Sequence, residues 1–423
     1  MPLHARLFAV PLVAAAAAAA AATAPAPAPD RTDADLAQLR AEGPPALERL
    51  LTAYDRARPG PARDALAATI DKVAAQRYAT VSRLYWYTDL DAAKKAAHAS
   101  GRPILSLRML GRLDEDLSCA NSRFFRTILY ANADVSRFLR DHFVLHWSSE
   151  RPVPTMTIDF GDGRRLERTV TGNSIHYVLD ADGRPLDALP GLYAPAIFRA
   201  ELERSLELVR RVADADDIGR GILVEVWHSN HRAERAFARS ALGSVTVLTG
   251  ARRLTTQADL DGALAKAQSV AITKAYVEVP TLLRTVDLGA DPGSLAKLDG
   301  DVEVWAAAGQ RAFGGRIAPG TLLDASSRAL VGAVLGPRDR AEVDAILARL
   351  EQTVVADTAQ NELRLRPEID ALFLAGAGAD LAGLNRRIYA EIFHTPATDP
   401  WLGLLDRTSF SGLPGDGVVR GRE

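Results

Sequence analysis

The clearest hydrophobic pattern in this chain is a helical spacing that gives way to a continuous apolar run and then resumes. The first helical spacing covers residues 90–97, with Thr88 as the expected N-cap and Gly101 as the expected terminator. The run ILSLRML at residues 104–110 predicts a buried strand. After an acidic loop, apolar positions at helical spacing begin again at Phe124. The order is therefore helix, strand, loop and helix.

Short apolar strands and helices continue to alternate beyond this point. A helix that begins at Asn132 or Asp134 leads to the next buried strand. Strands are predicted over residues 143–147, 156–160, 166–170, 175–179 and 185–189. The second and third form a hairpin around a Gly-Asp-Gly turn, and the last two form an antiparallel hairpin before a helix over residues 195–212. Helices between short buried strands indicate an α/β sheet with parallel pairing.

Mostly helical sequence flanks this α/β stretch on both sides. Apolar positions between residues 36 and 73 predict two or three short helices, separated by proline-rich breaks. Later helices are predicted over residues 222–242, 256–267, 270–286, 302–313, 338–365 and 384–393. We therefore divide the chain into a leader, a linker with N-terminal helices, an α/β domain and a mostly helical region, at residues 1–24, 25–83, 84–214 and 215–423.

The leader has the pattern of a secretory signal. A short basic segment containing Arg6 precedes an apolar run over residues 7–22, and small residues follow near the expected cleavage site. The apolar run is shorter than the roughly 20 residues needed to span a bilayer. We therefore expect an exported protein, periplasmic or extracellular, with no stable membrane insertion after removal of the signal.

The composition of the chain restricts which class of partner it can bind, but it says little about its activity. The 423 residues are 48% hydrophobic and 25% charged, which is enough apolar content for cores of ordinary size. A net charge of −2 gives no overall attraction to nucleic acid. The Gly-rich phosphate-binding motifs and the G-x-S-x-G nucleophile elbow are absent from the sequence. We expect a protein partner or client, no nucleic acid and no cofactor.

Cys119 is the only cysteine in the chain, so no disulfide can form within it. Its position at the start of a helix favours the thiolate, because unpaired N–H groups and the helix dipole face it. The string Cys119-Ala120-Asn121-Ser122 resembles the C-x-x-C motif of thioredoxin-fold proteins, with Ser in the second place. The strand, Asp-x-Asp-Gly turn, strand and helix of residues 175–212 resemble the second half of that domain.

The resemblance implies a thioredoxin-like αβα sandwich over residues 84–214. Its catalytic residues would be Cys119 and Ser122. Its substrate-binding residues would be Ser118, Asn121, Asn173 and Ser174. Because a serine cannot resolve a mixed disulfide, the implied activity is monothiol exchange or mixed-disulfide formation with a client. The alternative is a non-catalytic scaffold or protein-binding module of the same fold, in which Cys119 is structural.

The chain departs from the thioredoxin pattern at two places. Where that family has a cis-proline facing the cysteine, this chain has Asn173-Ser174. A cis bond there would cost roughly 2.5–4 kcal/mol, so a trans bond and an altered groove are expected. The loop before Cys119 is long and lacks a Trp next to the cysteine.

A peroxiredoxin-type site would need Thr or Ser three residues before the cysteine, and Asp116 occupies that place.

Two further patterns have both a functional and a structural interpretation. Glu225, His228, His231 and Glu234 are spaced so that they share one helix face, as metal ligands would. No cysteine or further histidine completes the set, so we expect polar surface residues and no metal. The proline-bounded segment 395–403 presents Trp401 either to a partner or to the rest of the chain. We expect it to anchor the C-terminal tail.

Overall fold

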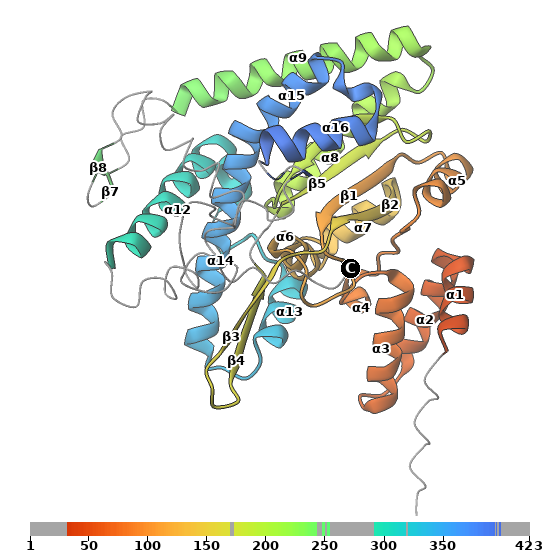
Figure 1. Cartoon of the computed structure of the whole chain (residues 1–423), viewed down its shortest axis with the longest axis vertical. Helices are drawn as coiled ribbons and strands as arrows, with labels where there is room; N and C mark the ends of the chain where they lie inside the picture. Colours follow the sequence, from red (N-terminus) through yellow and green to blue (C-terminus); the bar gives the residue numbers. More distant parts are fainter. Residues whose placement is uncertain are drawn as a thin grey trace, which may run out of the picture.

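The structure is a computed structural model that describes residues 32–169, 173–242, 248–249, 252–253, 292–318, 320–393, 395 and 397–398. It is mixed α/β, with a small mixed sheet at the centre and a helical C-terminal region, as the sequence predicts. In Figure 1 the N-terminal helices lie on the opposite side of the sheet from α9, α15 and α16. The leader, the predicted helices 256–267 and 270–286, and Trp401 fall outside the described residues.

Four helices precede the sheet. They are α1 (Asp33–Glu42), α2 (Pro44–Arg56), α3 (Pro61–Ala74) and α4 (Ala79–Ser82). Thr32 and Asp35 form a capping box at the start of α1. The helices share a small core of their own, which includes Leu47, Leu51 and Ile70. The predicted helical N-terminal region is confirmed, with a fourth short helix in addition.

The central sheet has the strand order β2-β1-β5-β6. Its strands are β1 (Ile104–Leu110), β2 (Val144–Arg151), β5 (Ser174–Leu179) and β6 (Pro185–Pro190). The associated helices are α5 (Leu90–Ser100), α6 (Ala120–Phe124) with its continuation η1 (Phe125–Leu129), α7 (Ala133–His142) and α8 (Pro195–Val212). Strands β1 and β2 are parallel, and β5 is antiparallel to both of its neighbours.

Local capping decides where the helices beside the sheet begin and end. The predicted cap of α5 was wrong by one residue: Asp89, not Thr88, accepts a hydrogen bond from the N–H of Ala92. Its short carboxylate reaches the free N–H groups of the first turn. Gly101 ends this helix at φ +67, as predicted. Asn132 caps α7 in the same way as Asp89 caps α5.

Both faces of the sheet are covered, as neighbouring residues of β5 show. Successive strand residues point to opposite faces. The ring of His176 packs against Phe125 and against Phe198 of α8. The hydroxyl of Tyr177 donates to the amide oxygen of Asn385, at 3.0 Å, on the other face. C-terminal helices therefore form one of the two layers that bury the sheet.

A separate hairpin connects β2 with β5. It consists of β3 (Thr155–Asp159) and β4 (Arg165–Thr169), which pair only with each other. Figure 1 shows it extending away from the main sheet. This agrees with the predicted inserted hairpin.

The rest of the described chain is mostly helical. Its elements are α9 (Asp217–Leu242), the short strands β7 (Leu248–Thr249) and β8 (Arg252–Arg253), α12 (Pro292–Phe313), η2 (Gly314–Ile317), α13 (Ala325–Leu335), α14 (Arg340–Gln360), η3 (Asn361–Leu365), α15 (Arg366–Leu374), η4 (Ala377–Ala379), α16 (Leu381–Arg387) and η5 (Ile388–Ile392). Helix α15 packs against both α9 and β6. Within the described ranges, no helix combines the length and the apolar character needed to cross a membrane.

Candidate functional site

Cys119 lies at the junction that the sequence predicts, between β1 and α6. The loop folds back onto the strand, because the N–H of Cys119 donates to the carbonyl of Leu110 at 3.3 Å. The N–H of Gly111 donates to the carbonyl of Arg151 at 2.8 Å. Gly111 has φ +74, and a Cβ at this position would lie 3.2 Å from the Cα of Ser118. Both the backbone conformation and the close approach therefore favour glycine here.

Arg126 holds the acidic part of the loop in place. Its guanidinium donates to the carbonyls of Leu113 at 3.1 Å, of Glu115, and of Asp116 at 2.9 Å. Burial lowers the pKa of Arg126 to about 10, so it remains a cation at neutral pH. The Asp116 carboxylate is 69% exposed and pairs with Arg77 at 3.0 Å. An exposed, ion-paired carboxylate is poorly suited to orient a peroxide at a thiol.

The thiol itself is inside the protein. Cys119 has no exposed surface and belongs to the main hydrophobic core. Burial raises the pKa of Tyr130 and of Tyr389, and Cys119 is a further cause of each shift. The sulfur is therefore near both phenols.

The other predicted site residues lie around the start of α6. The hydroxyl oxygens of Ser118 and Ser122 are 2.5 Å apart and form a hydrogen bond. The side-chain amide of Asn121 donates to the hydroxyl of Ser174 at 2.8 Å. Helix α6 is thus joined to the first residue of β5. All four side chains are at most 1% exposed.

The loop expected to face a substrate is covered by the chain's own C-terminal region. The amide of Asn173 donates to the hydroxyl of Thr395 at 3.0 Å, and both side chains are at most 3% exposed. The guanidinium of Arg151 donates to the Thr395 carbonyl at 3.3 Å. Tyr389 of η5 is also buried in this region. The peptide bonds between described residues are all trans, which includes the one before Ser174.

A buried histidine of β5, His176, forms a hydrogen bond with a buried tyrosine, Tyr130, at the end of η1. The hydroxyl oxygen of Tyr130 is 2.6 Å from Nε2 of His176. Burial lowers the pKa of His176 to about 3, so the ring is neutral at physiological pH. Sequence reasoning missed this pair. The signal was a histidine in the otherwise apolar strand SIHYVL.

The metal hypothesis for α9 does not match the structure. His228 is fully buried, whereas Glu225 and Glu234 are exposed. His231 uses Nδ1 to donate to the carbonyl of Trp227, at 2.8 Å. No group of three potential ligands suited to a metal ion occurs among the described residues. The expectation of surface residues was wrong for His228, because α15 and β6 cover that face of the helix.

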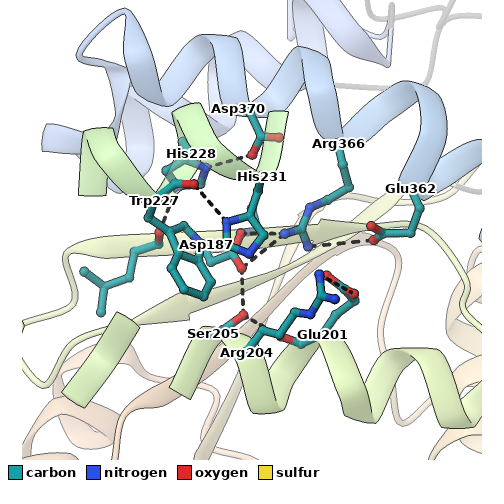
Figure 2. Close-up of polar contacts among 12 residues, drawn as sticks. Asp187, Glu201, Arg204, Ser205, Trp227, His228, His231, Glu362, Arg366 and Asp370 are labelled. Atoms are coloured by element: carbon teal, nitrogen blue, oxygen red, sulfur yellow. Dashed lines mark hydrogen bonds and ion pairs between the residues drawn. The ribbon is translucent and has the colours of Figure 1, made fainter. Parts of the chain in front are cut away.

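His228 belongs instead to a buried network of ionisable side chains, of which Figure 2 labels every member except Arg235. The network joins β6, α8, α9, η3 and α15. Its members are Asp187, Glu201, His228, Arg235, Glu362, Arg366 and Asp370. The Arg366 guanidinium lies 3.0 Å from Asp187, and each side chain is 1% exposed. Nδ1 of His228 faces Asp370 at 2.8 Å and Nε2 faces the Leu186 carbonyl at 3.0 Å. Both ring nitrogens therefore face an oxygen atom, one from α15 and one from β6.

The network gives two of its carboxyl groups, Asp187 and Glu201, opposite pKa shifts. Burial is the largest influence on Asp187 and acts to raise its pKa, but Arg366 and His228 outweigh it and the pKa falls to about 2. Burial also raises the pKa of Glu201, with Glu362 adding to the shift, to about 7. Glu201 therefore titrates near neutral pH, whereas Asp187 is a permanent anion. A polar residue within the apolar strand PLDALP was the sequence signal for Asp187.

Comparison with protein-family models, with curated proteins and with solved structures found no match to this chain. Its function is therefore inferred from the geometry of its own residues.

Proposed function

We propose that this chain is a protein-binding scaffold built on a thioredoxin-like domain, and that Cys119 has a structural role. The support for the domain is a parallel strand-helix-strand unit, β1 to β2, followed by the antiparallel hairpin β5-β6 and helix α8. The strand order β2-β1-β5-β6 is the order expected of a thioredoxin-like sheet. The domain proposed on this basis spans residues 84–214.

The burial of Cys119 carries the functional proposal. Thiol exchange requires a thiolate sulfur to approach a disulfide sulfur directly. Cys119 has no exposed surface, and Asn173, one of the residues expected to face a substrate, donates a hydrogen bond to Thr395 of the same chain. A client disulfide could reach a sulfur with no exposed surface only if the surrounding residues moved. The thiol lies within the hydrophobic core, a common place for a structural cysteine.

A partner surface is supported by helix α9. Ile218, Ile222 and Val226 follow one another at four-residue spacing and are 75%, 56% and 49% exposed. Residues at this spacing lie along one face of a helix. Large apolar side chains exposed in a row are typical of protein interaction sites. We assign the partner-binding role to this stripe.

Alkylation of the thiol tests the structural role of Cys119. We expect iodoacetamide to leave the folded chain unmodified from pH 6 to pH 8, and to modify one thiol after denaturation, as intact mass would show. Rapid modification of the folded chain below pH 7 would establish a reactive thiolate instead. The Cys119→Ala variant controls for reaction at other nucleophiles.

A second candidate function is monothiol exchange after the C-terminal segment moves aside. The observation in its favour is the position of Cys119 at the start of a helix, beside the hydroxyls of Ser118 and Ser122. A pull-down under non-reducing conditions separates the two functions. Partners retained by the Cys119→Ala variant and lost by Ile222→Asp support the scaffold. Partners that require Cys119 and are released by dithiothreitol support exchange.

The proposal includes export of the chain, on the basis of the signal-like first 24 residues. Fusion of residues 1–30 to a reporter enzyme that is active only outside the cytoplasm tests it. We expect reporter activity, and loss of that activity when Arg and Asp replace residues of the apolar run. A reporter that stays inactive would contradict export.

A further inference from the structure

A cleft separates the N-terminal helices from the edge of the central sheet. It has a volume of about 510 Å³ and is lined by residues of α2, of the segment around Tyr85 and of the start of β2. Its apolar wall includes Leu47, Leu51 and Phe143. This volume is within the range of small-molecule sites. None of the residues assigned a role above lies in it.

The lining of the cleft is strongly cationic. It contains Arg83, Arg102 and Arg140, against the single carboxylate of Glu48. Arg83 is paired with Asp55, at 2.6 Å. Arg102 and Arg140 make no ion pair with any carboxylate in the part of the chain that the structure describes. Two guanidinium groups thus line the cleft without a carboxylate at ion-pair distance among the described residues.

The arginines are held in place through the backbone. Nη1 of Arg102 donates to the carbonyl of Arg140 at 2.6 Å, and Nη1 of Arg140 donates to the carbonyl of Ser82 at 2.8 Å. Each guanidinium carries five N–H groups, so most of its donors remain for a ligand. Arg83 has φ +57, a left-handed conformation that is uncommon outside glycine and that often marks functional sites.

Neighbouring groups reinforce the preference for an anion. Burial lowers the pKa of Arg140, and repulsion from Arg83 and Arg137 adds to the effect, although Asp141 opposes it. A bound anion would offset both burial and repulsion. Burial raises the pKa of Tyr87, so its hydroxyl keeps its proton and can donate to the same anion.

We propose that this cleft binds a small organic anion, a carboxylate or phosphate ester with an apolar body. Its charged group is held by Arg102 and Arg140, with Arg83 at the rim. Its apolar body lies against Leu47, Leu51 and Phe143. Bidentate contact between a guanidinium and an oxyanion supplies the specificity. The site is independent of the role of Cys119 and of the α9 stripe.

Isothermal titration of the full chain tests the proposal with matched probes. Phenylacetate and phenyl phosphate share an apolar ring and differ in the anion, while 2-phenylethanol carries no charge. We expect at least one anionic probe to bind and the alcohol to bind at least tenfold more weakly. The stronger of the two anions identifies the carboxylate or the phosphate ester as the natural chemistry. Failure of both anions to bind, or equal binding of the alcohol, would overturn the proposal.

Three variants locate the binding site. Arg102→Gln should weaken binding of the better anion at least tenfold, because it removes an unbalanced guanidinium from the cleft. Arg387→Gln is the matched control, since Arg387 forms an exposed ion pair with Glu391 and does not line the cleft. Equal effects of the two variants would contradict the assignment.

The third variant keeps the test valid if Arg102→Gln fails to fold. Glu48 is exposed on α2 and is the only carboxylate in the lining. Glu48→Gln should therefore tighten binding of the anion severalfold at low salt, an effect that loss of structure cannot mimic. Unchanged or weaker binding would place the anion elsewhere. Circular dichroism of each variant checks the fold.

Discussion

The side-chain amide of Asn173 donates a hydrogen bond to the hydroxyl of Thr395 across 222 positions of sequence, at 3.0 Å. Asn173 precedes β5, the strand beside β1, and Cys119 follows β1 at the start of α6. The side chain of Thr395 therefore covers Asn173, one of the residues expected to face a substrate. Together with the hydrogen bond from Arg151 to the Thr395 carbonyl, this contact holds Thr395 against the residue that precedes β5.

Removal of that contact should expose Cys119 more often. Thr395→Val keeps the shape of the side chain but leaves the buried amide of Asn173 without its acceptor, at a cost of about 1–3 kcal/mol. If the segment opens locally, alkylation of Cys119 should accelerate by up to about tenfold for each 1.4 kcal/mol lost. The rate of iodoacetamide labelling under native conditions measures this.

Thr69→Val is the control for the Thr395 variant. The Thr69 hydroxyl bonds to the carbonyl of Ala65 on an exposed turn of α3, far in sequence from the site. Labelling of Cys119 should be unchanged in this variant. Equal rates in Thr395→Val and the wild type would show that Thr395 does not limit access.

The Arg366 and Asp187 pair should be among the most sensitive contacts in the protein. Arg366→Met leaves the Asp187 carboxylate buried without its main cation, which typically costs about 3–5 kcal/mol. Arg387→Met removes the exposed pair with Glu391 and should cost at most about 1 kcal/mol. Urea unfolding of both variants compares the two losses. Similar losses would mean that the buried pair is not specially stabilising.

Glu201 should make the protein less stable as the pH rises towards neutrality. Its pKa in the folded state, about 7, exceeds the ordinary value of 4.5, so the folded chain holds a proton that the unfolded chain releases between these pH values. Stability from this group is fully present below pH 4.5 and is lost by about pH 7. Glu201→Gln does not titrate, so its stability relative to the wild type should rise by up to roughly 3 kcal/mol over that interval.

The stability of Glu201→Gln must be compared with that of the wild type at each pH, because two buried histidines change the stability with pH in the opposite direction. Burial lowers the pKa of His146 and of His176 to about 3, so they stabilise the fold above pH 6.5 and lose that contribution as the pH falls towards 3. Both histidines are present in the wild type and in Glu201→Gln, so their contributions cancel in the stability difference between the two proteins. Urea midpoints at pH 5 and pH 8 measure it. A difference that is independent of pH would refute the assignment to Glu201.

Two glycine substitutions separate backbone strain from crowding. Gly111→Ala introduces a Cβ in a left-handed conformation, at about 1–2 kcal/mol, and also places it 3.2 Å from Ser118 and Val153. Gly163→Ala introduces a Cβ at φ +89 with no atom within 4 Å. We expect the first to lower the thermal midpoint more and to increase labelling of Cys119. Equal effects would indicate that the loop before Cys119 adjusts freely.

Local elements were predictable because their causes lie within a few residues. The strand Ile104–Leu110 and the helix Pro195–Val212 match the predictions, since apolar runs and helical spacing are local signals. The cap of α5 was missed because Thr88 and Asp89 are adjacent potential caps, and only the backbone geometry selects between them. The proximity of Asn121 to Ser174 followed from the resemblance, not from spacing.

The sequence by itself determined the helices and strands around Cys119 and the place of the thiol at the start of α6, because short-range patterns carry that information. Only the tertiary structure decided that the thiol is buried, that Thr395 covers Asn173, and that His228 joins an ion network rather than the surface. Burial and charge pairing depend on which distant segments come into contact. A periodic pattern shows that a face will be covered, but the partner that covers it is set by the packing of the whole chain.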